Sequence, residues 1–146
     1  MQRRTFLLAG TAMLILPLPA LAAPIQATLY KNPQCGCCEG YAAYLRENGF
    51  EVDVKPTNDL LEISHRAGVP EGKEGCHTMF IDGYVIDGHV PVNVVRKLLR
   101  EKPPIAGITL PGMPMGSPGM TGPKTETFVI YTVSKDGKAP EVYATE

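Results

Sequence analysis

The chain has 146 residues and a formal net charge of −1, with 14 Lys and Arg against 15 Asp and Glu. This length suits one domain and excludes a large multidomain enzyme. Hydrophobic residues make up 44% and charged residues 20% of the chain, which is typical of a globular protein and not of a disordered one. The basic residues do not cluster with aromatic residues, which argues against nucleic acid as a partner. Four Cys, six Met and three His, in a chain without Trp, point instead to sulfur chemistry.

The first 22 residues have the layout of an export signal. Arg3 and Arg4 precede an uncharged apolar stretch, and a run of small residues offers a cleavage site after Ala22. The apolar stretch is shorter than the roughly 20 residues of a membrane span. We therefore expect a cleaved signal and not a retained membrane anchor, which leaves no membrane span in the mature chain. The paired arginines suit twin-arginine export as well as the general secretory route. We therefore expect residues 1–22 to be removed and the mature domain, 23–146, to work in the periplasm.

Hydrophobic periodicity predicts, in chain order, strand 26–30, helix 39–48, strand 50–54, helix 58–67, strands 78–81 and 84–86, helix 91–101, and strands 128–134 and 141–144. Asp82-Gly83 is a signal for a tight hairpin turn. Segment 103–123 holds six Pro, five Gly and three Met, which predicts a long loop without regular structure. The first seven elements have the order βαβαββα. In this order the chain resembles a thioredoxin-like α/β fold.

Three cysteines, Cys35, Cys37 and Cys38, stand where the first strand hands over to the first helix. The positive end of a helix dipole favours thiolate, and thiolate both binds soft metals and attacks disulfides. Cys35 and Cys38 also have the spacing of a Cys-x-x-Cys redox motif. In thioredoxin-like folds the segment that enters the third strand packs against this turn, and here it carries Cys76. We therefore expect all four sulfurs to converge.

Three outcomes are open for the four sulfurs. Structural disulfides are common in exported domains; a bond between the neighbours Cys37 and Cys38 would be strained, which leaves Cys35 paired with one of them and Cys76 with the other. Zinc accepts four thiolates, or three with His77, but neighbouring cysteines at a helix start diverge by about 100°. Cu(I) prefers soft ligands and can be shared between thiolates, so Cu(I) fits the crowded spacing best.

A second group of soft ligands lies in the loop: Met113, Met115 and Met120. Thioether sulfur suits Cu(I), and a loop folded over the cysteines would bring one or more of these methionines to the metal. The alternative is that they fill hydrophobic gaps.

The histidines give a weaker signal. His77 adjoins Cys76 and is a candidate ligand or a neighbour of the ligands, although extended backbone would point it to the opposite face. His89 follows a strand, and we expect a structural role for it near the opposite rim. His65 is expected to be an ordinary surface or boundary histidine on a helix.

Five separated motifs carry a family resemblance: Cys35-x-Cys37-Cys38, Gly68-Val69-Pro70, Cys76-His77-Thr78, Gly83-Tyr84-Val85-Ile86-x-Gly88-His89-Val90-Pro91, and Pro111-Gly112-Met113-Pro114-x-Gly116-Ser117-Pro118-Gly119-Met120. Over roughly 27–143 the chain resembles the CopG-like periplasmic copper-resistance proteins, a metal-binding family. The resemblance implies a thioredoxin-like fold, copper at Cys35, Cys37, Cys38 and Cys76, and encoding beside copper-export systems. It also suggests conversion between cuprous and cupric ions.

The sequence thus predicts a periplasmic copper-binding protein of copper homeostasis or resistance, which holds one or more Cu(I) ions and interconverts Cu(I) and Cu(II). Cys35 and Cys38 would be the redox-active pair, and copper-export or copper-chaperone proteins would be partners. One alternative is a thiol-disulfide oxidoreductase acting on proteins, although Cys76-His77-Thr78 replaces the cis-proline that normally shapes its peptide groove. The other is a passive copper chaperone.

Overall fold

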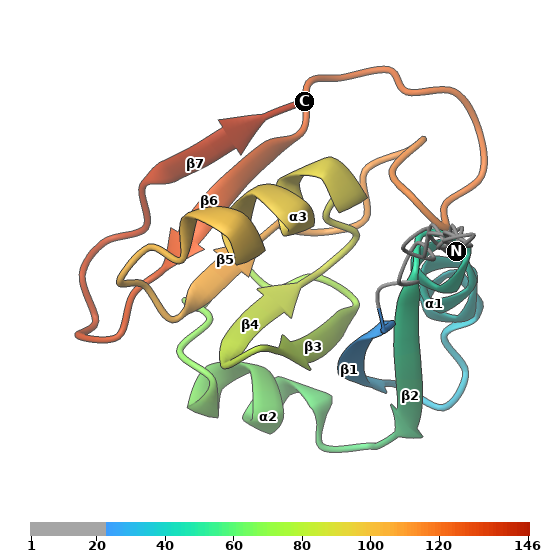
Figure 1. Ribbon diagram of the computed structural model, residues 1–146, viewed down its shortest axis with the longest axis horizontal. Helices are drawn as coiled ribbons and strands as arrows, with labels where there is room; N and C mark the ends of the chain where they lie inside the picture. Colours follow the sequence, from blue (N-terminus) through green and yellow to red (C-terminus); the bar gives the residue numbers. More distant parts are fainter. Residues whose placement is uncertain (1–22) are drawn as a thin grey trace, which may run out of the picture.

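The computed structural model describes residues 23–146, so the predicted export signal lies outside the described residues. These residues form one mixed sheet of seven strands with three helices (Figure 1). In chain order the elements are β1 (Ile25–Lys31), α1 (Gly36–Glu47), β2 (Phe50–Pro56), α2 (Leu60–Arg66), β3 (His77–Ile81), β4 (Tyr84–Asp87), α3 (Val92–Glu101), β5 (Gly107–Thr109), β6 (Val129–Val133) and β7 (Val142–Thr145). Within this part of the chain, no helix has the length and apolar character needed to cross a membrane.

The strand order across the sheet is β2-β1-β3-β4-β5-β6-β7. β1 pairs in parallel with β2 and antiparallel with β3, and β3 and β4 form an antiparallel hairpin. Asp82 and Gly83 turn this hairpin with φ of 46° and 79°, the positive values that a tight two-residue turn requires. The predicted hairpin is therefore confirmed, as is the closing antiparallel pair of β6 and β7.

The prediction that 103–123 lacks regular structure was wrong at one place, because β5 lies within this segment. β5 is only three residues long, pairs in parallel with β4 and antiparallel with β6, and is buried throughout. Gly107 lets the two backbones approach, since a β-carbon there would lie 1.8 Å from the carbonyl oxygen of Val85. The Pro and Gly content of the segment predicts a loop, and β5 is a strand because it pairs with β4 and β6.

Two helix boundaries also differ from those predicted. α1 begins at Gly36 instead of residue 39, with Cys35 as the N-cap residue, so Cys37 and Cys38 belong to the first helical turn. α2 begins at Leu60 after the N-cap residue Asp59, so Asn58 does not cap it.

The core lies mainly on the sheet face covered by α1 and α3. Tyr41 and Leu45 from α1, and Val95 and Leu98 from α3, are fully buried in one cluster with apolar residues of β1, β3, β4, β5 and β6. A smaller cluster on the opposite face gathers Val69, which follows α2, with residues of β4 and β6. Alternate residues of each strand therefore serve different faces.

Substituting Gly107 tests the close approach of β4 and β5. Gly107→Ala forces its β-carbon against backbone, so we expect the free energy of unfolding to fall by about 3 kcal/mol, measured by urea denaturation. Gly36→Ala is the matched control, because a β-carbon there meets nothing within 4 Å. A Gly107→Ala protein as stable as this control would contradict the prediction.

Candidate metal centre

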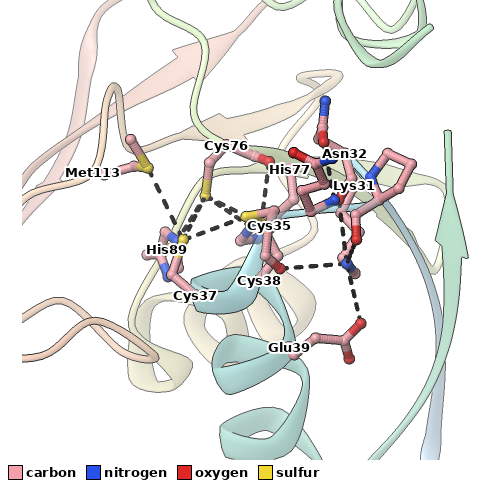
Figure 2. Close-up of a disulfide and its surroundings, with 12 residues drawn as sticks. Lys31, Asn32, Cys35, Cys37, Cys38, Glu39, Cys76, His77, His89 and Met113 are labelled. Carbon is pink, nitrogen blue, oxygen red and sulfur yellow. Dashed lines mark hydrogen bonds and ion pairs between the residues drawn. A yellow bond between two sulfur atoms is a disulfide. The ribbon is translucent and has the colours of Figure 1, made fainter. Parts of the chain in front are cut away.

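Two chain segments meet at the start of α1. The β1–β3 register pairs Lys31 with His77, so Cys76, one residue earlier, lies beside the turn that leaves β1. That turn leads into Cys35 and the first turn of α1. Figure 2 shows the cysteines of the two segments pointing toward one another.

The four cysteine sulfurs lie within 4.8 Å of one another, which agrees with the predicted convergence. Cys35 and Cys38 are joined by a disulfide, while Cys37 and Cys76 are free thiols. The Sγ of Cys76 lies 3.4 Å from that of Cys38 and 3.7 Å from that of Cys37, and the Sγ of Cys37 lies 3.4 Å from that of Cys35. One of the two pairings expected from sequence joins Cys35 to Cys38 and Cys37 to Cys76. The first of these bonds is present, and the second is not formed.

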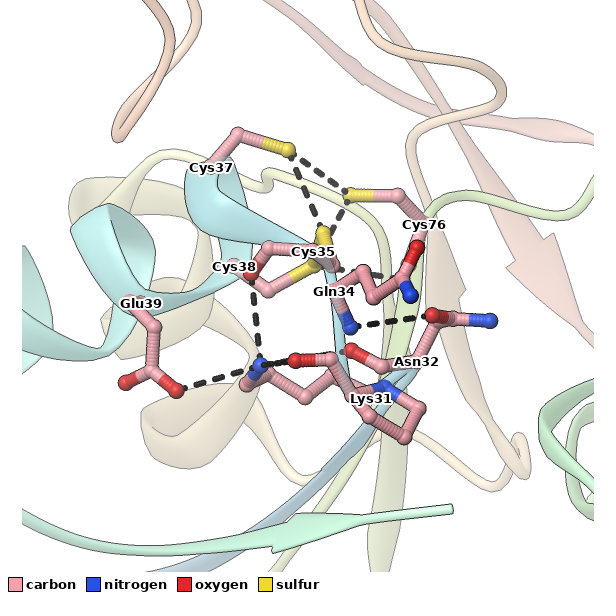
Figure 3. Close-up of polar contacts among 9 residues, drawn as sticks. Lys31, Asn32, Gln34, Cys35, Cys37, Cys38, Glu39 and Cys76 are labelled. Carbon is pink, nitrogen blue, oxygen red and sulfur yellow. Dashed lines mark hydrogen bonds and ion pairs between the residues drawn. A yellow bond between two sulfur atoms is a disulfide. The ribbon is translucent and has the colours of Figure 1, made fainter. Parts of the chain in front are cut away.

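Lys31 holds the turn that carries Cys35 (Figure 3). Its side chain is almost fully buried, and its Nζ donates to the carbonyl oxygens of Asn32, Pro33 and Cys35 at 3.2–3.3 Å. The Nζ also lies 3.1 Å from a carboxylate oxygen of Glu39 in α1. A buried ammonium must be compensated in this way, so the four oxygens and the cation fix the turn together. Sequence analysis missed this residue, since one Lys at a strand end carries no special signal.

Asp87 holds the second segment. Its carboxylate accepts hydrogen bonds from the backbone N–H of Gly75, from Thr78 Oγ1 at 2.7 Å and from Ser64 Oγ at 3.1 Å. Burial raises the pKa of Asp87, and these three hydrogen bonds oppose that rise. The carboxylate thus ties α2, β3 and β4 to the residue before Cys76. Sequence analysis did not single it out.

Two buried histidines complete the centre. His89 Nε2 lies 2.8 Å from the Sγ of Cys76, and His77 Nδ1 lies 3.6 Å from the same sulfur. The sequence predicted that His89 lies near the opposite rim, and this position was wrong. β4 runs antiparallel to β3, so its end brings His89 beside Cys76. His77 does extend toward α1, yet its ring still reaches Cys76. Burial lowers the pKa of both imidazoles, so both are neutral near pH 7. His65 pairs with Glu74 at the surface.

Segment 111–123 folds over the start of α1. Gly119 passes so close to α1 that a β-carbon there would lie 2.8 Å from the carbonyl oxygen of Cys37. The Sδ of Met113 lies 4.0 Å from the Sγ of Cys37 (Figure 2). Met115 is 51% exposed and lies against Gly122, while Met120 is half-buried. Among the three candidate methionines, Met113 is the one that the fold brings to a cysteine sulfur.

Cys76 directly precedes β3 and does not lie at a helix start, and its surroundings favour the protonated thiol. Burial raises the pKa of its thiol, and the neighbouring Cys37 and Asp87 add to the rise. Cys76 is therefore a thiol near neutral pH, and a metal ion that binds its sulfur must displace the proton.

Oxidation of a Cys35→Ser variant tests the convergence. Removing Cys35 frees Cys38, whose nearest cysteine sulfur outside α1 is that of Cys76 at 3.4 Å. We expect a new disulfide between residue 76 and the first turn of α1, identified by peptide mapping. The double variant Cys35→Ser/Cys76→Ser should not form it. Only intermolecular bonds in the single variant would contradict the geometry.

Asp87→Asn tests the buried carboxylate. Because the folded-state pKa of Asp87 lies above its ordinary value of 3.8, the folded protein retains a proton that the unfolded chain has released. The stability of the wild-type protein relative to the variant should therefore fall as pH rises above about 4, by at most about 1.4 kcal/mol per pH unit, until the raised folded-state pKa of Asp87 is passed. Urea denaturation of both proteins across this range measures it, and a pH-independent difference would refute it.

Comparison with known proteins identifies relatives of this chain. The family described as "Protein of unknown function, DUF411" matches residues 73–120, and no functionally curated protein matches. A solved structure titled "Copper resistance protein copG- Form 2" is 35% identical with a TM-score of 0.78, and its Form 1 is 34% identical with a TM-score of 0.77. Each alignment covers 84% of this chain and 98% of the other. The chain therefore belongs to the family of the CopG copper resistance protein.

Proposed function

We propose that this protein binds Cu(I) through the thiolates of Cys35, Cys37, Cys38 and Cys76. The observation that carries the proposal is the gathering of these four sulfurs from two chain segments. Two sulfurs bound at 2.3 Å to one tetrahedral ion would be about 3.8 Å apart, and the sulfurs here lie 3.4 to 3.7 Å apart between Cys76 and α1. Small adjustments would therefore admit an ion.

The softness of the donors favours Cu(I) over zinc. Thiolate and thioether sulfur select Cu(I), and Met113 adds a thioether 4.0 Å from Cys37. Zinc sites use thiolate and imidazole but have no need of a thioether. The likeness to solved structures of a copper resistance protein supports the same choice. We propose Met113 as the foremost auxiliary ligand, with Met115 and Met120 as weaker candidates.

The disulfide makes copper binding depend on redox state. While Cys35 and Cys38 are bonded, only Cys37 and Cys76 remain as thiols. Two electrons and two protons convert the disulfide into two thiols, which complete the set of four. We propose that the reduced protein is the Cu(I)-binding form.

The same pair supports a second candidate function, the interconversion of Cu(I) and Cu(II). In one direction, the dithiol of Cys35 and Cys38 gives one electron to each of two Cu(II) ions, which yields two Cu(I), one disulfide and two protons. The presence of this disulfide beside two free thiols favours the candidate. A passive chaperone would bind copper without this exchange.

A thiol-disulfide oxidoreductase acting on proteins is the weaker alternative. The strand order β2-β1-β3-β4 and the position of α1 support a thioredoxin-like core, in which a cis-proline would face the Cys-x-x-Cys pair. His77 follows Cys76 there instead, and the described residues contain no cis peptide bond. This favours metal over a peptide substrate.

The place of action is also part of the proposal. The export signal predicted for residues 1–22 would deliver domain 23–146 to the periplasm, where copper-export or copper-chaperone proteins would be its partners. Thiols oxidise in that compartment unless they are protected, and bound copper would protect them.

Competition with a Cu(I) chelator under anaerobic conditions tests the binding function. We expect fully reduced protein to bind Cu(I) more than ~100-fold more tightly than the disulfide form, because that form lacks two of the four thiolates. Cys76→Ser should weaken binding by the reduced protein similarly. Equal affinity of both redox forms, or stronger binding of Zn(II) than of Cu(I), would reject the proposal.

Two matched methionine variants test the auxiliary ligand. Met113 and Met115 are similarly exposed, at 55% and 51%, but only Met113 contacts a cysteine sulfur. Met113→Leu should weaken Cu(I) binding by about threefold to tenfold, and Met115→Leu should leave it unchanged. If Met115→Leu weakened Cu(I) binding and Met113→Leu did not, Met115 and not Met113 would be the auxiliary ligand.

A further inference from the structure

We infer that the outer face of α2, with the hollow beside it, is a docking surface for a second copy of this chain. Two molecules would join there as a symmetric dimer. The surface contains none of the cysteines and is independent of the proposed copper function. A two-fold dimer uses the same patch on both subunits, so the patch must complement itself. α2 and the hollow meet this requirement in shape and in charge.

The hollow lies between α2 and the sheet and has a volume of about 360 Å³. Tyr30 of β1 and Phe80 of β3 line it, and their rings meet edge to face with centroids 5.9 Å apart. Ile63 and Arg66 of α2 and the C-cap residue Ala67 line it on the helix side. Phe80 is 37% exposed, although its neighbours along β3 are buried in the core on the other sheet face. The hollow thus presents aromatic surface whose burial would be favourable.

A protruding side chain on the same helix matches the hollow. Leu61 is 59% exposed, more than any other large hydrophobic side chain in the part of the chain that the structure describes. Two copies of α2 can pack antiparallel about a two-fold axis at the level of Ser64. Leu61 of each copy then faces Ala67 of the other, at the edge of the hollow. The dimer would contain this contact twice, because the axis repeats it.

The charges on α2 have the same symmetry. Glu62 and Arg66 lie one helical turn apart, and both are largely exposed, with 3.3 Å between a carboxylate oxygen and a guanidinium nitrogen. Such a pair contributes little within one helix, so both groups are free to turn toward another molecule. In the antiparallel arrangement, Glu62 of each copy faces Arg66 of the other. This charge complementarity favours a second copy over an unrelated partner, because the chain itself carries both halves of each pair.

The size of the surface sets the strength of the dimer. α2 has seven residues, so the contact is smaller than the roughly 1,600 Å² buried in a stable interface of standard size. We therefore expect a reversible dimer whose population rises with protein concentration, and not an obligate one.

Sedimentation equilibrium tests the dimer. The full chain carries Cys37→Ser and Cys76→Ser with the Cys35–Cys38 disulfide intact, so no free thiol can link two molecules. Between ~1 µM and ~1 mM protein, we expect the mass to rise from that of one chain toward that of two. All variants share this chain, so any effect of residues 1–22 is common to them. The mass of a single chain at every concentration would overturn the inference.

Two matched apolar variants locate the interface. Leu61→Asp places a carboxylate in the contact and should weaken association at least ~tenfold. An acidic residue in the first turn of a helix is favourable, so we expect α2 to stay folded. Val142→Asp is the control, because Val142 is 58% exposed on the edge strand β7, and it should leave association unchanged. Equal effects of the two variants, or no effect of Leu61→Asp, would overturn the inference.

Charge reversal separates contacts between copies from contacts within α2. Glu62→Arg and Arg66→Glu should each weaken association by about tenfold, since each places like charges across the axis. An equimolar mixture should associate more tightly than either variant alone, because one copy then presents two arginines to two glutamates of the other. Like charges within each helix remain in the mixture, so tighter association reports contact between copies. A mixture that associates no more tightly would overturn the inference; if a charge variant does not fold, the comparison of Leu61→Asp with Val142→Asp decides.

Discussion

The antiparallel register of β1 and β3 is the constraint on which the centre depends. Pairing of Lys31 with His77 brings Cys76 beside the turn that begins α1, and with it the fourth sulfur. A slip of one residue would turn His77 toward the opposite sheet face and away from Tyr41. Burial of alternate residues on the face covered by α1 and α3 fixes this register, because Met79 and Ile81 are fully or almost fully buried on the same face as His77.

Two buried charges then hold the segments that the register brings together. Lys31 ties the turn before α1 to Glu39, and Asp87 ties the segment before Cys76 to α2 and β3. Each charge is compensated by several polar partners, as burial requires. The sulfurs therefore do not depend on flexible loops for their positions, which is the arrangement that a reproducible metal site needs.

The centre combines soft and harder donors around one shared residue. Cys76 contacts the sulfurs of α1 on one side and His77 and His89 on the other. Sulfur and nitrogen donors therefore lie side by side at one residue. The disulfide further links the number of available thiolates to the redox state of the protein.

The sequence by itself determined the order of most helices and strands, both hairpins and the cysteine cluster, because these follow from local periodicity, turn residues and short spacings. It placed Met113 among three equivalent candidates and assigned His89 to the wrong rim. The tertiary structure alone decided which methionine reaches Cys37, that His89 faces Cys76, that β5 joins the sheet, and that Lys31 and Asp87 hold the site. Those features depend on contacts between residues far apart in the chain, and the free energy of such contacts comes from packing and burial that no local pattern encodes.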